Sequence, residues 1–131
     1  MKTLEEVKKA FEGDLYATQT TGIEIDELGE NYAKCSLILE KKHKNAWGIT
    51  MGGAIYTLSD FAFAVASNID ELNTVTTVSN ISFINAVKGD VIYANAKCLK
   101  DGKKLVFYEV EVTDNLDTLV ANVTFTGTKL K

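Results

Sequence analysis

One apolar segment in the middle of the chain places the strongest constraint on the fold. From Gly52 to Ile69 the hydrophobic residues recur at helical spacing, and no run of β-branched residues opposes a helix. They cover one broad face of such a helix, namely Ile55, Leu58, Ala62, Val65 and Ile69. A helix that is apolar over most of its circumference is surrounded by other parts of the protein. We therefore predict a long buried helix around which the rest of the chain is organised.

The segments on both sides of this helix alternate between apolar and polar residues, as half-buried strands do. Before the helix, the alternation begins at Thr21 and is clearest from Tyr32 to Glu40. After it, four segments rich in Val, Ile, Tyr, Phe and Thr are predicted strands: Val75–Ile84, Val91–Leu99, Leu105–Thr113 and Leu119–Thr126. Near the start, Thr3 and Glu6 form the pattern of a capping box, which opens a short amphipathic helix that stops at Gly13.

Short turns separate the four late strands: Lys88-Gly89-Asp90, Asp101-Gly102 and Asn115-Leu116-Asp117. The Asp-Gly pair favours a hairpin because both residues tolerate positive φ. The turns predict an antiparallel meander of all four strands. The order is helix, two strands, helix, four strands, and it is typical of an α+β fold. In it, a curved antiparallel sheet wraps around the central helix, and residues 1–131 form a single domain.

Composition excludes several classes of function. The net charge is −4, and all 14 basic residues are lysines scattered among acids. Nucleic-acid-binding proteins usually cluster their basic residues and use arginine, so no nucleic-acid partner is expected. No uncharged apolar run is long enough to span a membrane, and acids occupy the place of a signal peptide's apolar stretch. The expectation is a soluble cytoplasmic protein.

The residues that usually hold metals and cofactors are scarce. One histidine and two cysteines give little support for a zinc site, and Cys35 and Cys98 are expected to be buried free thiols. The glycines of Gly48–Gly53 lack the lysine and hydroxyl that a phosphate-binding loop requires. We predict neither metal nor cofactor. His43 stands in a lysine-rich segment and is expected to be exposed to solvent.

The central helix carries one charged residue, Asp60. Burying an unpaired carboxylate costs roughly several kcal/mol, so a sequence selected only to fold would avoid it. On the helix, Asp60 shares a side with small or polar residues: Gly53, Tyr56, Thr57, Ala64 and Ser67. This stripe fits a face turned to water or a satisfied hydrogen-bond network, and it equally fits a functional carboxylate.

The start of the helix favours the functional interpretation. Gly52 and Gly53 leave backbone N–H groups uncovered at the positive end of the helix dipole. Such groups could stabilise the oxyanion of an acyl transfer reaction, although two glycines also make a tight entry turn. A carboxylate two turns from an anion-stabilising helix end resembles half of a hydrolase site.

The stretch from His43 to Ala54, continued by Leu58-Ser59-Asp60, resembles the signature of hotdog-fold thioesterases. The resemblance is greatest to their PaaI-like branch, which includes the small THEM-type acyl-CoA thioesterases. The family pattern has an asparagine, a histidine six residues later, two glycines and an aspartate on the central helix. Val75–Phe83 resembles the strand that follows, and Gly89-Asp90 matches the next turn. The resemblance implies a hotdog fold.

The resemblance also implies hydrolysis of acyl-CoA or aryl-CoA thioesters without a cofactor. Asp60 would act as general base or nucleophile, and the backbone N–H of Gly52 would polarise the thioester carbonyl. Asn45 would help to place the thioester or water, and Thr76, contributed by the partner subunit, would orient water. Family members form homodimers with shared sites and commonly homotetramers. Further substrate contacts are expected from Met51, Gly53, Tyr56 and Lys88.

Met51 is the main departure from the family, which usually has histidine there. Methionine is only a weak acceptor, and loss of one oxyanion donor costs on the order of a hundred- to a thousandfold in rate. Two alternatives to hydrolysis therefore stay open. One is a non-catalytic hotdog module that binds acyl-CoA. The other is a dehydratase or hydratase, although those sites usually depend on a catalytic histidine.

Several lysines are candidates to attract the phosphates of CoA, since the chain has no arginine. They are Lys41, Lys42 and Lys44, together with Lys88 or Lys103. The sequence does not choose among them.

Overall fold

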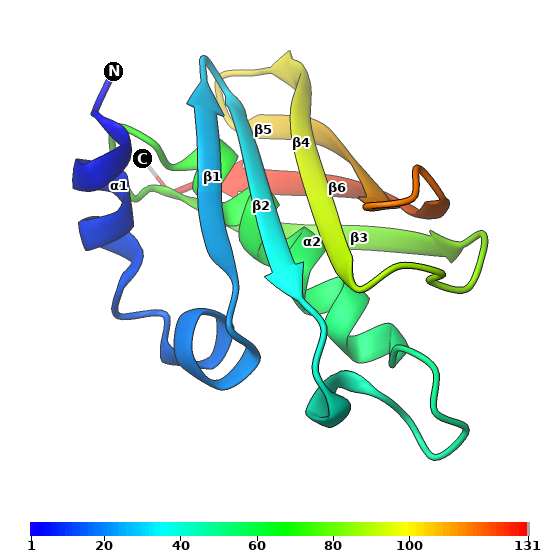
Figure 1. Cartoon of the computed structure of the whole chain (residues 1–131). Coiled ribbons are helices and arrows are strands. Elements are labelled where there is room, and N and C mark those ends of the chain that lie inside the picture. The colour runs from blue at the N-terminus through cyan, green and yellow to red at the C-terminus, as the bar shows by residue number, and fades with distance from the viewer. Residues whose placement is uncertain (131) are drawn as a thin grey trace.

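The computed structural model describes residues 1–130 and has a six-stranded antiparallel sheet that curves around one long helix (Figure 1). The elements are α1 (Leu4–Phe11), a π-helical turn η1 (Tyr16–Thr21), β1 (Glu24–Gly29), β2 (Tyr32–Ile38), a 3-10 turn η2 (Lys41–His43), α2 (Gly52–Ser67), β3 (Thr74–Phe83), β4 (Val91–Asp101), β5 (Leu105–Asp114) and β6 (Leu119–Lys129). The predicted α+β architecture is therefore confirmed.

The helix α2 is buried on the predicted face. The predicted core residues, including Ile69 just beyond the helix, are at most 7% exposed, and α2 contacts mainly β4 and β2. The opposite stripe is less buried, as its small and polar residues suggested. Among the described residues, no helix has the length and hydropathy that crossing a bilayer requires.

The last residue of α2 is Ser67, two residues before the predicted end at Ile69, and Asn68 is its C-cap. Its Nδ2 donates to the carbonyl oxygens of Ala64 and Thr74, at 2.8 and 3.1 Å. Its Oδ1 accepts from the Thr74 N–H at 2.8 Å. One side chain thus caps the carbonyl of Ala64 in the last turn of the helix and fixes the start of β3, which explains why the helix stops here.

The strand order differs from the predicted meander. The sheet runs β1-β2-β4-β5-β6-β3, so β4, β5 and β6 form a meander but β3 does not join it. Instead β3 pairs with β6 at one edge of the sheet, and β4 pairs with β2. The segment between β3 and β4 is therefore a crossover and not a hairpin.

A buried carboxylate explains this crossover. Asp114, only 2% exposed, accepts hydrogen bonds from the N–H groups of Lys88 and Gly89 at 2.9 and 3.0 Å. It also accepts bonds from the N–H groups of Leu116 and Thr118, both at 2.9 Å. These contacts hold the crossover against the β5–β6 turn. Burial alone would raise the pKa of Asp114, but the four donors outweigh it and hold the pKa well below its usual range.

The predicted Asp101-Gly102 hairpin is present between β4 and β5, but neither residue has positive φ. The Gly102 N–H donates to the Leu105 carbonyl oxygen at 3.0 Å. A Cβ on Gly102 would lie 2.5 Å from that oxygen. Glycine is required here by the close approach of the two backbones, and not by φ.

The N-terminal capping box is confirmed. The Glu6 N–H donates to Thr3 Oγ1 at 3.2 Å, and the Thr3 N–H donates to Glu6 Oε1 at 2.9 Å. α1 ends at Phe11, whose buried ring packs edge to face on Phe61 of α2 at 5.8 Å between centroids. This contact seats the N-terminal segment on the central helix and leads the chain into η1.

His43 is buried, at 5% exposure, so the prediction that it faces solvent is wrong. Its Nδ1 accepts from the Glu40 N–H at 2.9 Å, so its Nε2 carries the proton and donates to the Thr21 carbonyl at 2.7 Å. The lysines around it point to water, but the imidazole turns inward. His43 therefore joins the connection between β2 and α2 to the end of η1.

Both cysteines are free thiols. Cys35 is fully buried, as predicted, whereas Cys98 is only partly buried next to a β-bulge in β4. Burial raises the pKa of both thiols. Neither therefore has the thiolate character of a reactive cysteine.

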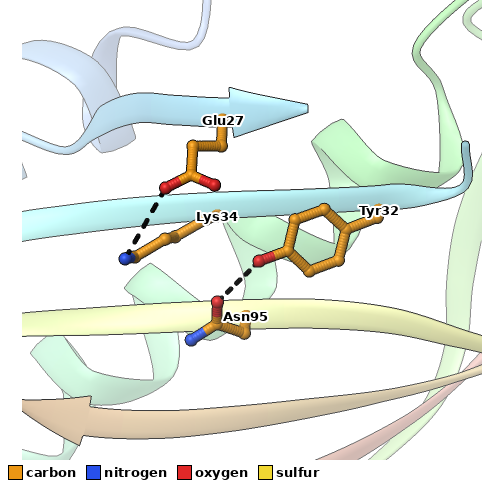
Figure 2. A network of polar contacts seen from close by, with 4 residues as sticks. All are labelled: Glu27, Tyr32, Lys34 and Asn95. Atoms are coloured by element: carbon orange, nitrogen blue, oxygen red, sulfur yellow. Dashed lines mark hydrogen bonds and ion pairs between the residues drawn. The ribbon is translucent and has the colours of Figure 1, made fainter. Parts of the chain in front are cut away.

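The outer face of the sheet, opposite α2, carries polar pairs (Figure 2). Tyr32 donates from its hydroxyl to Asn95 Oδ1 at 2.7 Å. Lys34 Nζ lies 3.7 Å from Glu27 Oε2 and 4.9 Å from the centroid of the Tyr93 ring. Exposed ion pairs of this kind stabilise the fold by about 0–1 kcal/mol each. The pair nevertheless occupies the ammonium group of Lys34.

Candidate active site

Asp60 lies in the middle of α2, on the less buried stripe. It lines a cavity of about 290 Å³ together with Thr57, Phe61 and Ala64 of α2 and with residues 14–17 at the start of η1. Burial raises the pKa of Asp60, and the negative charge of Asp14 across the cavity raises it further. The two ion pairs found among residues 1–130 involve other residues. Asp60 is thus a half-buried carboxylate that faces a cavity.

The N-terminus of α2 lies two turns away. Met51 is the N-cap residue and is 54% exposed. Its side chain makes no capping hydrogen bond to the helix N–H groups among residues 1–130. The first N–H groups of the helix are therefore left for solvent or a ligand. The Met51 N–H donates to the His43 carbonyl at 2.8 Å, which holds the entry to the helix in place.

Gly52 is explained by packing, not by a special turn. Its φ is not positive, but a Cβ at this position would lie 3.0 Å from Cζ of Phe83, the last residue of β3. A Cβ on Gly53, by contrast, would meet open space. The first glycine lets β3 cross the helix end closely, and the second leaves a backbone amide uncovered.

A second cavity, of about 390 Å³, opens at this helix end. Its walls are mostly apolar and come from the loop before α2, the start of α2 and the crossover: Asn45, Ile49, Thr50, Gly52, Ile55 and residues 83–87. An apolar cavity with a few polar groups is the usual form of a small-molecule site.

Asn45 organises the loop that forms one wall of this second cavity. Its Oδ1 accepts hydrogen bonds from the N–H groups of Trp47 and Ile49, at 3.0 and 3.3 Å. Its backbone N–H donates to the Ile49 carbonyl at 2.8 Å. Since the oxygen is engaged in the loop, the part of Asn45 suited to a substrate is Nδ2, which donates and would bind a carbonyl oxygen.

Three other predicted residues, Tyr56, Thr76 and Lys88, line neither of these two cavities. Tyr56 shares a 2.6 Å hydrogen bond between its hydroxyl and Ser79 Oγ, which ties α2 to β3. Thr76 is exposed on β3 opposite Gly127, directly before a β-bulge. The Lys88 side chain is exposed on the crossover, while its backbone N–H is held by Asp114.

The predicted site residues thus fall into two groups. Gly52 and Asn45 line one cavity, and Asp60 lines another. Gly52 and Asp60 are eight residues apart on one helix, or about 12 Å along its axis. A single protomer therefore does not bring the carboxylate and the amide to one carbonyl group.

Two residues at the site were missed from sequence. Asp14 follows a helix end and looks like an ordinary turn residue, and Phe83 looks like the end of a strand. Only the folded arrangement brings Asp14 to Asp60 and Phe83 to Gly52. Within residues 1–130, no three His, Cys, Asp or Glu side chains gather in a way that could hold a metal ion.

Comparison with known proteins shows the family of the chain. The model of the Thioesterase superfamily matches residues 48–121 of the 131. A putative esterase of Archaeoglobus fulgidus is 35% identical over 98 residues, which are 74% of this chain and 64% of that protein. The acyl-coenzyme A thioesterase PaaI of Escherichia coli is 27% identical over 121 residues, 92% of this chain and 86% of that enzyme. The chain thus spans just under two thirds of the first relative and most of the second.

Solved structures show the same fold. The PaaI protein of Escherichia coli, from the phenylacetic acid degradation operon, matches with a TM-score of 0.87 at 22% identity, over 98% of this chain and 94% of that one. The smu.793 protein of Streptococcus mutans, solved with acetyl-CoA, matches with a TM-score of 0.72 at 25% identity, over 82% and 87% of the two chains.

These likenesses and the sheet around α2 define a hotdog fold. The chain belongs to the Thioesterase superfamily. The predicted hotdog fold and the predicted resemblance to PaaI-like thioesterases are confirmed.

Proposed function

We propose that the protein hydrolyses acyl-CoA or aryl-CoA thioesters to the free acid and CoA. The observation that carries this proposal is the pair of groups on α2: a half-buried carboxylate, Asp60, and an uncapped N-terminus at Gly52 beside Asn45. Acyl-CoA as substrate is supported by the PaaI relative, named an acyl-coenzyme A thioesterase, and by the Streptococcus mutans protein, solved with acetyl-CoA.

In the proposed reaction, the thioester carbonyl oxygen accepts hydrogen bonds from the Gly52 N–H and Asn45 Nδ2. Asp60 takes a proton from water as the water attacks the carbonyl carbon, and the negative charge develops on the carbonyl oxygen at the helix N-terminus. The carbon–sulfur bond then breaks and CoA leaves as the thiolate, which takes up a proton. Alternatively, Asp60 attacks the carbonyl itself and water hydrolyses the resulting mixed anhydride. A carboxylate pKa raised toward working pH suits a general base.

This reaction requires Asp60 and Gly52 at the same carbonyl, so we propose a homodimer with shared sites. β3 is a ten-residue edge strand, and Val75 and Val78 on it are 45% and 63% exposed. A long edge strand with exposed apolar residues pairs readily with another strand. In the dimer it would pair antiparallel with the β3 of a second copy.

A two-fold axis that pairs the two β3 strands also accounts for the shared site. Tyr56 is midway between Gly52 and Asp60 in the sequence, and it bonds to Ser79 near the middle of β3. If the axis passes close to this bond, two antiparallel α2 helices place residue 60 of one copy opposite residue 52 of the other. The same axis would bring Thr76 of the partner strand toward the site. The predicted homotetramer would be a pair of such dimers.

Met51 favours a second candidate, a module that binds acyl-CoA without hydrolysis. The thioether at the N-cap donates no hydrogen bond, so the carbonyl would be polarised only by the backbone and Asn45. For the enzyme, we expect Met51→His to increase the turnover number. For the binding module, we expect saturable acyl-CoA binding and no thiol release with either residue.

The first experiment is thiol release from short, medium, long and aromatic acyl-CoAs by wild type and Asp60→Asn. The control is Glu71→Gln, an exposed acid beyond the C-terminal end of α2. We expect turnover by wild type and the control, and a loss of about a hundredfold or more in Asp60→Asn. Full activity of Asp60→Asn would refute the proposed mechanism. If wild type releases no thiol from any substrate, hydrolysis is excluded and the acyl-CoA-binding module is the remaining candidate.

Mixing two inactive variants tests the shared site. In a dimer of Asp60→Asn with Asn45→Ala, one site has both changes and the other has neither. We expect about a quarter of the wild-type activity after unfolding and refolding the mixture, since half of the dimers are mixed and each has one intact site. If each site lay within one protomer, mixing would restore nothing.

A further inference from the structure

The loop before α2 exposes the only tryptophan of the chain. Trp47 is 88% exposed, more than any other large apolar side chain among the described residues. Ile49 and Met51, at alternate positions after it, are also exposed, at 46% and 54%. An apolar surface of this kind on a monomer often marks a binding site.

The loop holds Trp47 in a defined position. Besides the bonds to Asn45 Oδ1, the Gly48 N–H donates to the Asn45 carbonyl at 2.9 Å. Gly48 has a φ of +82°, and Lys44 and Thr50 form a β-bridge that closes the base of the loop. The backbone of Trp47 is therefore held by a fixed turn, so the loop itself need not be ordered when a ligand binds.

Three exposed lysines stand next to this aromatic residue. Lys41, Lys42 and Lys44 follow one acid, Glu40, so the local charge is strongly positive in a protein of net charge −4. The ion pairs among residues 1–130 leave these lysines unpaired, since they join Lys34 and Lys129 to acids. We call residues 41–47 the Lys-Trp loop.

The Lys-Trp loop adjoins the proposed site of the thioester. The hydrogen bond from Met51 N–H to the His43 carbonyl places it beside the N-terminus of α2, and in Figure 1 it projects beyond the end of β2 and α2. A ligand whose acyl end reaches the cavity at Gly52 can therefore extend its other end over this loop.

The structure separates this loop from the other candidate lysines. Ile38 pairs with Val91 at the start of β4, so the loop lies at that end of the sheet. Lys103 follows Asp101 at the other end of this 11-residue strand, or about 35 Å away. Lys34, which was not a candidate from the sequence, is engaged with Glu27 on the outer face (Figure 2). Lys88 directly follows residues 83–87 of the crossover, which form another wall of the cavity, and no aromatic residue lies within four residues of it in the sequence.

We propose that the 3′-phosphoadenosine diphosphate end of CoA binds on the Lys-Trp loop, with its adenine stacked on Trp47 and its phosphates beside Lys41, Lys42 and Lys44. This inference rests on the proposed function, because it assumes that CoA binds at this site. It adds a subsite for the nucleotide to the proposed site of the thioester. Stacking of a base on an aromatic side chain and ionic contacts to phosphate are established recognition modes for nucleotides.

Fluorescence gives a direct test, because Trp47 is the only tryptophan. We expect CoA and adenosine 3′,5′-bisphosphate to change the emission saturably, and added salt to weaken both. Pantetheine, which lacks the nucleotide, should leave the emission unchanged. Emission that responds to protein concentration but not to CoA would overturn the proposal and assign Trp47 to a contact between copies of the chain.

Kinetics give an independent test. Trp47→Ala and the triple change of Lys41, Lys42 and Lys44 to Gln should each raise KM for acyl-CoA about tenfold with little change in kcat. Neither should alter turnover of the same acyl group on pantetheine, and Trp47→Phe should recover most of the affinity. Lys103→Gln is the matched control. Equal losses on both substrates would overturn the proposal.

The two proposals fail in different ways. If no substrate is turned over but CoA still changes the Trp47 emission, hydrolysis fails and the nucleotide subsite stands. If wild type hydrolyses acyl-CoA and acyl-pantetheine with the same KM, hydrolysis stands and the nucleotide subsite fails.

Discussion

Asp14 and Asp60 line the same cavity, although Asp14 precedes η1 and Asp60 lies in the middle of α2. Burial is the larger cause of the raised pKa of Asp60, and the charge of Asp14 is the second. A negative charge nearby disfavours the ionised form of a carboxyl group. The N-terminal segment, through Asp14, therefore raises the pKa of the proposed catalytic base.

Asp14→Asn should lower the pKa of Asp60, because it removes a negative charge and leaves the burial in place. A general base must be ionised, so kcat/KM falls as the pH drops through its pKa. The acidic limb of the profile should then move to lower pH in the variant. The measurement is kcat/KM against pH, and Glu12→Gln, an exposed acid outside the cavity, should leave the limb unmoved. An unchanged limb in Asp14→Asn would show that the two carboxylates do not interact.

Asp114→Asn should destabilise the fold at pH 7 by about 3 kcal/mol, because the amide group faces backbone donors that the carboxylate satisfied. The folded-state pKa of Asp114 lies below its ordinary value of 3.8. Its stabilisation is therefore fully present above that value and is lost as the pH falls below it. Urea unfolding should show a gap in the free energy of unfolding between wild type and variant that is constant near neutral pH and narrows only as the pH falls below 3.8. The control is Asp117→Asn, an exposed position with φ of +62° that asparagine tolerates. A gap that stays constant with pH would contradict the assignment.

His43→Phe should lower the free energy of unfolding by about 2 kcal/mol, because the Thr21 carbonyl and the Glu40 N–H both lose their partner. Activity should fall as well, since the His43 carbonyl holds the Met51 N–H at the start of α2. His43→Gln can keep one donor and one acceptor and should lose less. Denaturation and thiol release measure the two effects. A stable and fully active His43→Phe would contradict the structural role given to this residue.

Val78→Lys should disrupt the proposed dimer, because a charged side chain on an edge strand blocks pairing with another strand. Light scattering should give the mass of a monomer, circular dichroism should keep the spectrum of the folded protein, and thiol release should be lost. Thr124→Lys, on a strand paired on both sides, should stay dimeric and active. An active monomer would exclude a shared site.

Periodicity made the central helix and the strands predictable, because it reports which side chains face the core. It does not report which strand is the neighbour, so the pairing of β3 with β6 was missed. His43 was misplaced because its neighbours are charged, whereas its own contacts are with distant backbone groups. Asp114 looks like any turn residue until its four donors come together from two separate turns. Local patterns thus predicted the elements, and long-range hydrogen bonds decided the rest.

The pairing of β3 with β6 also has a consequence for how the chain folds. The strands β4, β5 and β6 are joined by short turns and can form as neighbouring hairpins. In contrast, β3 can pair only with β6, and β4 and β5 lie between the two in the sequence. Contacts between distant segments form late, because the loop between them must close first. We therefore expect β3 to be among the last strands to settle. Since β3 also carries the edge offered to a second copy, a chain can join its partner only after β3 has paired with β6.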